Sequence, residues 1–320
     1  MPSGYGRGKK GLKMEKSIKK QKLSPLKRRE HLIAMGFISF KYVGFILFVF
    51  LPVLFSILYS FANYNAAYET EPFLSIFADR FSGFETYKML FNSRYADEFK
   101  QAILNNLFLL LSVPMGILLG ILIAAILSRP NIKGSNTFRL LIYMPVVASA
   151  VAMNVIWRYM FDNQYGLINK VLGVELLWLS DDTLVKIAIV IKNSWGAIGR
   201  TMILCLAAMY AVDDSYYEAA RLDGAGEMIK FFKITLPLIT PTLFYLFITG
   251  VINNLQIYTD SLIFASGDKG ARTVVYFIWQ YGIRNSLYGF AAAASTLLTI
   301  TIMAITIVQF RFSNRWVFEG

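Results

Sequence analysis

Five long stretches of this 320-residue chain contain no charged residue, and they set the strongest limit on its fold. Each approaches or exceeds the roughly 20 residues that an α-helix needs to cross the hydrocarbon core of a bilayer. A sixth stretch, at about 184–211, is apolar apart from Lys186, Lys192 and Arg200. Because a soluble domain of this size would carry more charge than 16%, the sequence predicts an all-α membrane protein with six transmembrane helices. The uncharged stretches are Tyr42–Phe61, Ala102–Ser128, Leu140–Trp157, Ile234–Thr259 and Ser286–Phe310.

Charged residues are distributed unevenly between the connecting segments. Eleven of the 32 Lys and Arg residues fall within residues 1–30, ahead of the first predicted span. Since Lys and Arg accumulate on the cytoplasmic side of membrane proteins, this tail is predicted to be cytoplasmic. The connections at 62–101 and 161–182, with six and four acidic residues, then lie outside. Six spans return the chain to its starting side, so both termini are predicted to be cytoplasmic.

The formal net charge of +12 would suggest nucleic-acid binding in a soluble protein, but here the charge lies beside a membrane span. We predict a basic cytoplasmic tail over 1–35, either a disordered flank or a segment that contacts anionic lipid headgroups. A transmembrane domain is expected over 36–311, with a core that begins at about 98. A short cytoplasmic tail is expected over 312–320.

The composition excludes several kinds of site. His31 is the single histidine and Cys205 the single cysteine. A multi-histidine metal site, histidine-based catalysis and a disulfide framework are therefore not expected. The chain also lacks the G-x-x-x-x-G-K-[ST] loop that binds nucleotide phosphates. It is predicted not to be an enzyme, and if it works by ATP, another chain binds the nucleotide.

Two polar clusters interrupt the fourth and fifth predicted spans. Polar side chains at membrane depth are costly and usually face a cavity or the bundle interior. Amides match paired sugar hydroxyls and aromatic rings pack on pyranose C–H faces, so the clusters suit a hydroxylated solute. The competing interpretation is that the amides only hold helices together by hydrogen bonds. The predicted solute-path residues are Asn193, Trp195, Arg200, Asn253, Asn254, Gln256 and Tyr258.

Arg200 is the most specific member of this set. It follows Asn193 by seven residues, which is about two helical turns and therefore the same helix face. Its guanidinium is expected to pair with Asp260 or a backbone carbonyl, or to favour an anionic or highly hydroxylated solute. Lys192 is expected instead to extend towards the outer membrane interface, as long cationic side chains do.

A segment of mixed charge, residues 216–241, separates the fourth and fifth spans and falls on the predicted cytoplasmic side. Its first ten residues predict a short helix, which Asp213, Asp214 or Ser215 could cap. Gly224 favours a turn at the end of that helix, because glycine adopts positive φ at little cost.

The same segment contains, in order, Glu218-Ala219-Ala220, Asp223-Gly224-Ala225, Phe231-Phe232, Ile234, Leu236-Pro237 and Pro241. This order resembles the EAA motif of the membrane subunits of binding-protein-dependent ABC importers. The resemblance covers about 36–312, and Asn193-Ser194-Trp195 is similar to the carbohydrate branch that includes the maltose permease subunits. It implies the type I ABC importer permease fold, with five core helices and one N-terminal helix.

The resemblance also implies partners. A coupling loop over 213–237 would dock its first helix on a separate ATPase, which binds ATP and Mg²⁺, while this chain binds no cofactor. A second permease subunit would form a heterodimer with this one. Two ATPase subunits and an extracytoplasmic solute-binding protein would complete the complex. The complex would lie in the prokaryotic cytoplasmic membrane. The residues that the motif assigns to coupling are Glu218, Ala219, Ala220, Asp223, Gly224, Ala225, Leu236 and Pro237.

The resemblance implies that a sugar or oligosaccharide is imported by alternating access, and it places Asn193 at a sugar-contacting position. Arg200 stands where the maltose subunit has an aromatic residue, which leaves open other oligosaccharides, uronic-acid polymers or modified sugars. The same architecture could import an amino acid, phosphate or a polyamine. A transporter acting alone would need a proton-coupling carboxylate within the spans, and Asp260, near an interface, suits that role poorly.

Overall fold

The computed structural model describes residues 25–65, 67, 80–129, 132–264, 269–313 and 315–318, so most of the predicted basic tail lies outside the described residues. The chain divides into two units, residues 1–55 and 56–320. In the first unit, α1 (Pro25–Phe45) leads through a π-helical turn (Ile46–Phe50) into α2 (Leu51–Tyr59). The widened turn ends two residues before Pro52, which has no amide hydrogen to donate to the helix.

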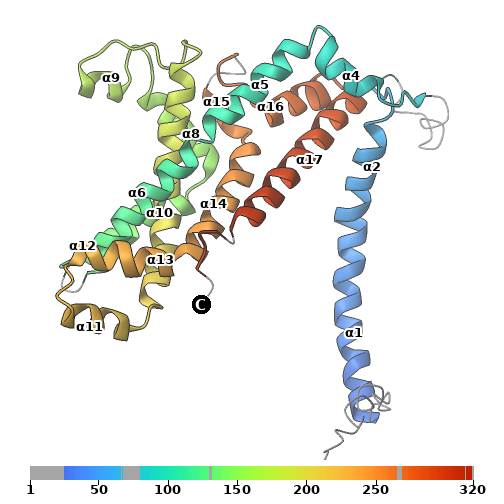
Figure 1. Ribbon diagram of the computed structural model, residues 1–320. Helices are drawn as coiled ribbons and strands as arrows, with labels where there is room; N and C mark the ends of the chain where they lie inside the picture. The colour runs from blue at the N-terminus through green and yellow to red at the C-terminus, as the bar shows by residue number, and fades with distance from the viewer. Residues whose placement is uncertain are drawn as a thin grey trace, which may run out of the picture. The chain divides into compact units, whose positions relative to one another are not determined.

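The regular structure described in the second unit is helical, apart from one antiparallel bridge between Ala62 and Phe81 (Figure 1). Its elements are α4 (Glu85–Asn92), α5 (Ala96–Leu109), α6 (Ser112–Leu127), α7 (Ser135–Val147), α8 (Ala150–Met160), α9 (Leu167–Leu172), α10 (Leu184–Tyr210), α11 (Asp214–Leu222), α12 (Glu227–Lys230), a π-helical turn (Phe231–Thr235), α13 (Leu236–Leu238), α14 (Thr240–Leu255), α15 (Thr259–Phe264), α16 (Val274–Trp279), a second π-helical turn (Gln280–Arg284) and α17 (Tyr288–Ser313). The prediction of an all-α protein is confirmed for the described residues.

Three helical stretches are long and apolar enough to cross a membrane unbroken, namely Ile33–Tyr59, Ala96–Leu127 and Tyr288–Ser313. Three further candidates are helix pairs that meet at a bend. These are α7 with α8 at 101°, α10 with α11 at 72°, and the segment Glu227–Leu238 with α14 at 64°. The described residues therefore contain three to six candidate spans, depending on whether each bent pair counts as one.

The predicted third span is the most strongly broken of these candidates. α7 ends at Val147, two residues after Pro145, which cannot donate a backbone hydrogen bond. Ala148 and Ser149 then have ψ values of 154° and 129°, which are extended rather than helical. The chain turns through 101° before α8 begins, so this span is not the single helix that its apolar composition suggests.

Helix α10 is the centre of the second unit and packs against α6, α7 and α14. Small residues bring it close to α6. A Cβ atom added at Gly116 would lie 2.7 Å from Ala197 Cβ, and one added at Gly120 would lie 2.4 Å from Thr201 Cβ. Close backbone approach of this kind drives helix association in membranes, where lipid tails are as apolar as leucine.

Two asparagines of α5 hold the segment that leads into α16. The Asn105 amide donates to the carbonyls of Lys269 and Arg272, both at 2.8 Å. The Asn106 Oδ1 atom accepts from the backbone amide of Val274, also at 2.8 Å. Both asparagines are buried, and both act as ties between helices, which is the role that the competing interpretation gave to amides in this protein.

Candidate functional site

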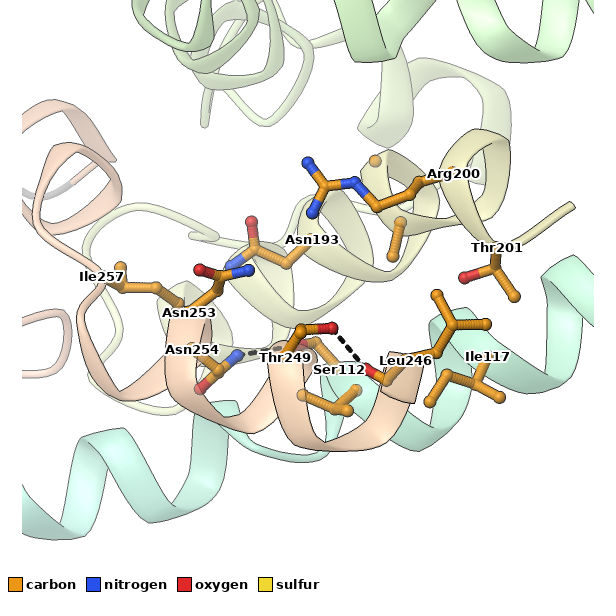
Figure 2. Close-up of a pocket in the computed structure, with 14 residues that line it drawn as sticks. Ser112, Ile117, Asn193, Arg200, Thr201, Leu246, Thr249, Asn253, Asn254 and Ile257 are labelled. Carbon is orange, nitrogen blue, oxygen red and sulfur yellow. Dashed lines mark hydrogen bonds between the residues drawn. The ribbon is translucent and has the colours of Figure 1, made fainter. Parts of the chain in front are cut away.

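A cavity of about 230 Å³ lies between α6, α10 and α14 in the middle of the second unit. Its lining combines small apolar side chains with three asparagines and several hydroxyls, and Figure 2 shows the polar side chains directed into it. Each of the three helices contributes at least one polar side chain to the lining. The polar lining residues are Ser112, Asn193, Arg200, Thr201, Thr249, Asn253 and Asn254.

Asn254 both ties helices together and faces the cavity. Its amide nitrogen donates to the Leu109 carbonyl at 3.0 Å and to the Ser112 hydroxyl at 2.8 Å. Its Oδ1 atom is buried without a hydrogen-bond partner in the described residues, and so is the amide nitrogen of Asn193. Because unpaired buried polar atoms are costly, these two atoms are available to a ligand or to water in the cavity.

Arg200 carries the charge of the cavity. It is exposed, and no hydrogen bond or ion pair joins it to any residue that the structure describes. Asp260, which the sequence offered as its partner, is instead bound by Lys192, with 2.8 Å between Nζ and Oδ1.

Lys192 is thus paired with Asp260, and its extension towards the membrane interface stays a prediction. Lys192 and Arg200 are eight residues apart, so their side chains point about 80° apart around α10 at 100° per residue. Arg200 shares the face of Asn193, whereas Lys192 faces α15, where the Asp260 carboxylate is only 8% exposed. A buried carboxylate requires a counter-charge, and Lys192 supplies it.

The other predicted solute-path residues do not line this cavity. Trp195 packs edge-on against Trp157, with 5.3 Å between ring centroids. Tyr258 packs against Trp279 at 5.7 Å. Gln256 is exposed just beyond the end of α14. Of the seven predicted residues, the structure brings together Asn193, Arg200, Asn253 and Asn254.

The segment after α10 forms the predicted short helix, α11. Among the three predicted caps, Asp213 provides the cap, because its carboxylate accepts from the Ser215 amide at 2.8 Å. Hydrogen bonds from the side chain and the backbone of Ser215 hold the pKa of Asp213 below its ordinary value. At the other end Gly224 has φ +75°, and the Ala225 amide donates to the Ala220 carbonyl at 2.9 Å. The predicted helix and its glycine turn are confirmed.

Helix α11 has one attached face and one open face. Tyr217 faces the protein, and its hydroxyl lies 2.9 Å from the Thr235 hydroxyl. The open face and the turn that follows expose Glu218, Ala219, Asp223 and Gly224, while Ala220 and Ala225 are half-buried. Leu222 is 90% exposed. Leu236 and Pro237 are half-buried in α13, so the most exposed of the predicted coupling residues lie on α11 and the turn after it.

Residues 116–318 match the family of the binding-protein-dependent transport system inner membrane component. The chain belongs to this family. It is therefore the permease component of a binding-protein-dependent ABC importer, a multi-pass protein of the bacterial inner membrane without a catalytic role of its own.

Relatives extend the match over most of the permease. It is 28% identical to the probable ABC transporter permease protein YesP of Bacillus subtilis, over 91% of this chain and 93% of that one. It is 30% identical to the lactose transport system permease protein LacF of Rhizobium radiobacter, over 72% of this chain and 80% of that one. A solved structure of a bacterial alginate ABC transporter is 23% identical, with a TM-score of 0.76. The match covers 92% of this chain and 98% of that one. The family and this likeness establish the type I ABC permease fold.

The lining of the permease cavity includes residues that the sequence did not single out. Ser112, Thr201 and Thr249 contribute hydroxyls from three different helices. Isolated serines and threonines are common in membrane helices and often bond to their own backbone, as Thr249 does to the Tyr245 carbonyl at 2.7 Å. Their place at the cavity depends on how α6, α10 and α14 pack, which the local sequence does not reveal.

Proposed function

We propose that this permease moves a sugar or oligosaccharide inward across the cytoplasmic membrane by alternating access. The observation that carries the proposal is the cavity itself, where amides of Asn193, Asn253 and Asn254 meet the hydroxyls of Ser112 and Thr249. Amides both donate and accept, as the paired hydroxyls of a sugar do. The lactose transport system permease protein LacF, which is 30% identical, supports the same solute class.

The topology that suits this function has six spans with both termini in the cytoplasm. It takes one span from each bent helix pair and leaves α11 in the cytoplasmic loop after α10, and it agrees with the positive-inside distribution of charge. The transmembrane domain then covers 36–311, between cytoplasmic tails at 1–35 and 312–320. Of the predicted solute-path residues, Asn193, Arg200, Asn253 and Asn254 contact the solute, whereas a contact for Trp195, Gln256 and Tyr258 remains a prediction.

The proposed partners are those that the resemblance to ABC importers implies. A second permease subunit completes a heterodimer, two ATPase subunits bind ATP and Mg²⁺, and an extracytoplasmic binding protein delivers the solute. The coupling loop, 213–237, presents the open face of α11 to the ATPase. Glu218 offers a charge to basic groups there, and Ala219 permits close contact because it adds little bulk. Movement of the ATPase pair would shift the equilibrium between inward-open and outward-open states.

The test is substrate-stimulated ATP hydrolysis by the complete complex, reconstituted in lipid vesicles with its binding protein. A panel of neutral and acidic oligosaccharides is compared with amino acids, phosphate and polyamines. Stimulation by a saccharide, lost in Asn193→Ala and kept in Asn92→Ala, is the expected result. Asn92 is the matched control because it is exposed at the end of α4 and does not line the cavity. Stimulation only by an amino acid, phosphate or a polyamine would refute the proposal.

A further inference from the structure

Arg200 is the single ionisable side chain among the 14 described residues that line the cavity. It projects from α10 near the middle of its course, sixteen residues after the helix begins at Leu184. Figure 2 shows its guanidinium extending from the helix towards the amides of Asn193 and Asn253. The positive charge of Arg200 therefore lies beside the amides that we propose to bind sugar hydroxyls.

The ion pair that Lys192 forms does not neutralise it. Lys192 and Asp260 form an ion pair at 2.8 Å, with side chains that are 13% and 8% exposed. That pair is electrically balanced and faces α15 rather than the cavity. Among the residues that the structure describes, none donates to or accepts from the guanidinium, so the positive charge of Arg200 is left to the cavity.

The space around the guanidinium is also suited to a ligand. Gly196 lies one turn before Arg200 on the cavity face, and a Cβ atom added there would meet nothing within 4 Å. Ala197, the next lining residue, is small as well. Bulky side chains at these two positions would occupy the space beside the Arg200 guanidinium. The small residues of α10 leave that space open.

A cation at membrane depth is costly, and such residues normally face a partner or a substrate pathway. Arginine differs from lysine because its planar fork binds a carboxylate or phosphate through two parallel hydrogen bonds. A neutral sugar needs no such fork, because amides suffice for its hydroxyls.

From this arrangement we propose that the solute is an anionic saccharide, whose carboxylate or phosphate binds Arg200 while its hydroxyls bind Asn193 and Asn253. The inference rests on the proposed function and adds the charge of the substrate to it. Carboxylate and phosphate share this chemistry, and the choice of probes separates them.

The experiment uses the complete reconstituted complex with its binding protein and measures ATPase stimulation and uptake. The probes are trigalacturonate, its neutral methyl ester, and glucose 6-phosphate beside glucose. We expect the wild-type complex to prefer one acidic probe over its neutral counterpart by about ten- to a hundred-fold, the usual range for a charge-assisted hydrogen bond. Arg200→Gln should remove most of that preference, and Arg200→Lys should restore part of it.

Three results would overturn the inference. Preference of the wild-type complex for the neutral member of each pair would leave sugar import intact and remove the anionic substrate. An equal loss for acidic and neutral probes in Arg200→Gln would show that Arg200 serves assembly, for example by pairing with an acid of the second permease subunit. If amino acids stimulate and no saccharide of either charge does, the proposed function itself fails. The wild-type comparison decides the question even if an Arg200 variant does not assemble.

Discussion

The ammonium group of Lys192 on α10 lies 2.8 Å from the carboxylate of Asp260 on α15, and both side chains are largely buried. Removing one partner of such a pair leaves a charge without compensation, which costs about 3–5 kcal/mol. We expect Asp260→Asn to lower the thermal stability of the detergent-solubilised permease accordingly. The double variant Lys192→Met/Asp260→Leu should recover most of the loss, because an apolar pair carries no desolvation cost.

Lys170→Met provides the control for this prediction, since Lys170 is exposed on α9. Its unfolding temperature should match that of the wild type. If Asp260→Asn is as stable as the wild type, or if the double variant is no better than the single ones, the ion pair does not hold α10 against α15.

Gly224 provides a second test, because it adopts φ +75° while a Cβ atom there would meet nothing within 4 Å. A substitution is therefore opposed by backbone strain and not by a clash. The left-handed conformation costs about 1–2 kcal/mol for residues with a Cβ atom, and more for β-branched ones. We expect Gly224→Val to relieve this strain by displacing the end of α11 from its position on the ATPase. A strain of this size corresponds to about a tenfold fall in uptake per ATP hydrolysed.

Gly226 is the matched control for this variant. It also has nothing within 4 Å of an added Cβ atom, but its φ is −70°, which any residue adopts. Gly226→Val should keep the wild-type ratio of uptake to hydrolysis, and Gly224→Asn should fall between the two because asparagine tolerates positive φ. Wild-type coupling in Gly224→Val would contradict the assignment of this turn to energy transfer.

Features that depend on neighbouring residues were predictable from the sequence. A helix that begins after one of Asp213, Asp214 or Ser215 and ends before Gly224 follows from a capping side chain and a residue that accepts positive φ. The apolar spans follow from composition, since about 20 uncharged residues must avoid water. The shared face of Asn193 and Arg200 follows from helix geometry alone, and the cavity lining agrees with it.

Features that depend on packing between helices were not predictable in the same way. Lys192 and Arg200 of α10 could each have paired with Asp260, and only the position of α15 assigns the carboxylate to Lys192. Pro145 indicated a disturbance in the third span, but the 101° turn needs the extended backbone at Ala148 and Ser149 as well. Trp195 belongs to a polar sequence cluster, yet it packs on Trp157 because it lies on a different face of α10 from Asn193.

Close packing of α6 on α10 gives a third prediction. A methyl group at Gly120 would lie 2.4 Å from Thr201 Cβ, a clash that must be relieved by moving the helices apart. Gly120→Ala should therefore destabilise the permease by about 1–3 kcal/mol, the usual cost of overpacking. Gly196→Ala on α10 is the control, because an added Cβ atom there meets nothing within 4 Å. Equal unfolding temperatures for the two variants would contradict the close approach at Gly120.

The carboxylate cap of α11 predicts a pH dependence. Hydrogen bonds from Ser215 lower the pKa of Asp213 from 3.8 in the folded protein. The stabilisation is therefore complete above that ordinary value and is lost as the pH falls through the lowered folded pKa. The opening of the first turn of α11, measured by backbone amide hydrogen exchange, should not depend on Asp213 at neutral pH, where its carboxylate is ionised. Opening should increase in acid, where the carboxylate is protonated.

Asp213→Asn supplies the reference for this measurement at each pH, because an asparagine caps without titrating. Exchange in the two proteins should match at neutral pH and diverge below about pH 3.8, with the faster exchange in the wild type. Asp213→Ala should exchange faster than both proteins at neutral pH. Identical profiles for the wild type and Asp213→Asn throughout would show that the carboxylate does not cap the helix.

Asn253 and Asn254 are adjacent in sequence but differ in environment, so they separate the two roles of amides in this protein. Asn253 is exposed to the cavity, whereas Asn254 is buried and donates to Leu109 and Ser112. Asn254→Ala should lower stability by about 1–3 kcal/mol, because it removes two buried hydrogen bonds. Asn253→Ala should keep the stability of the wild type and lower substrate-stimulated ATP hydrolysis. Unfolding temperatures and stimulated ATPase rates of both variants, measured in the same complex, decide between the two roles. If both variants change only stability, the amides serve as ties between helices and the cavity loses its assignment as the solute site.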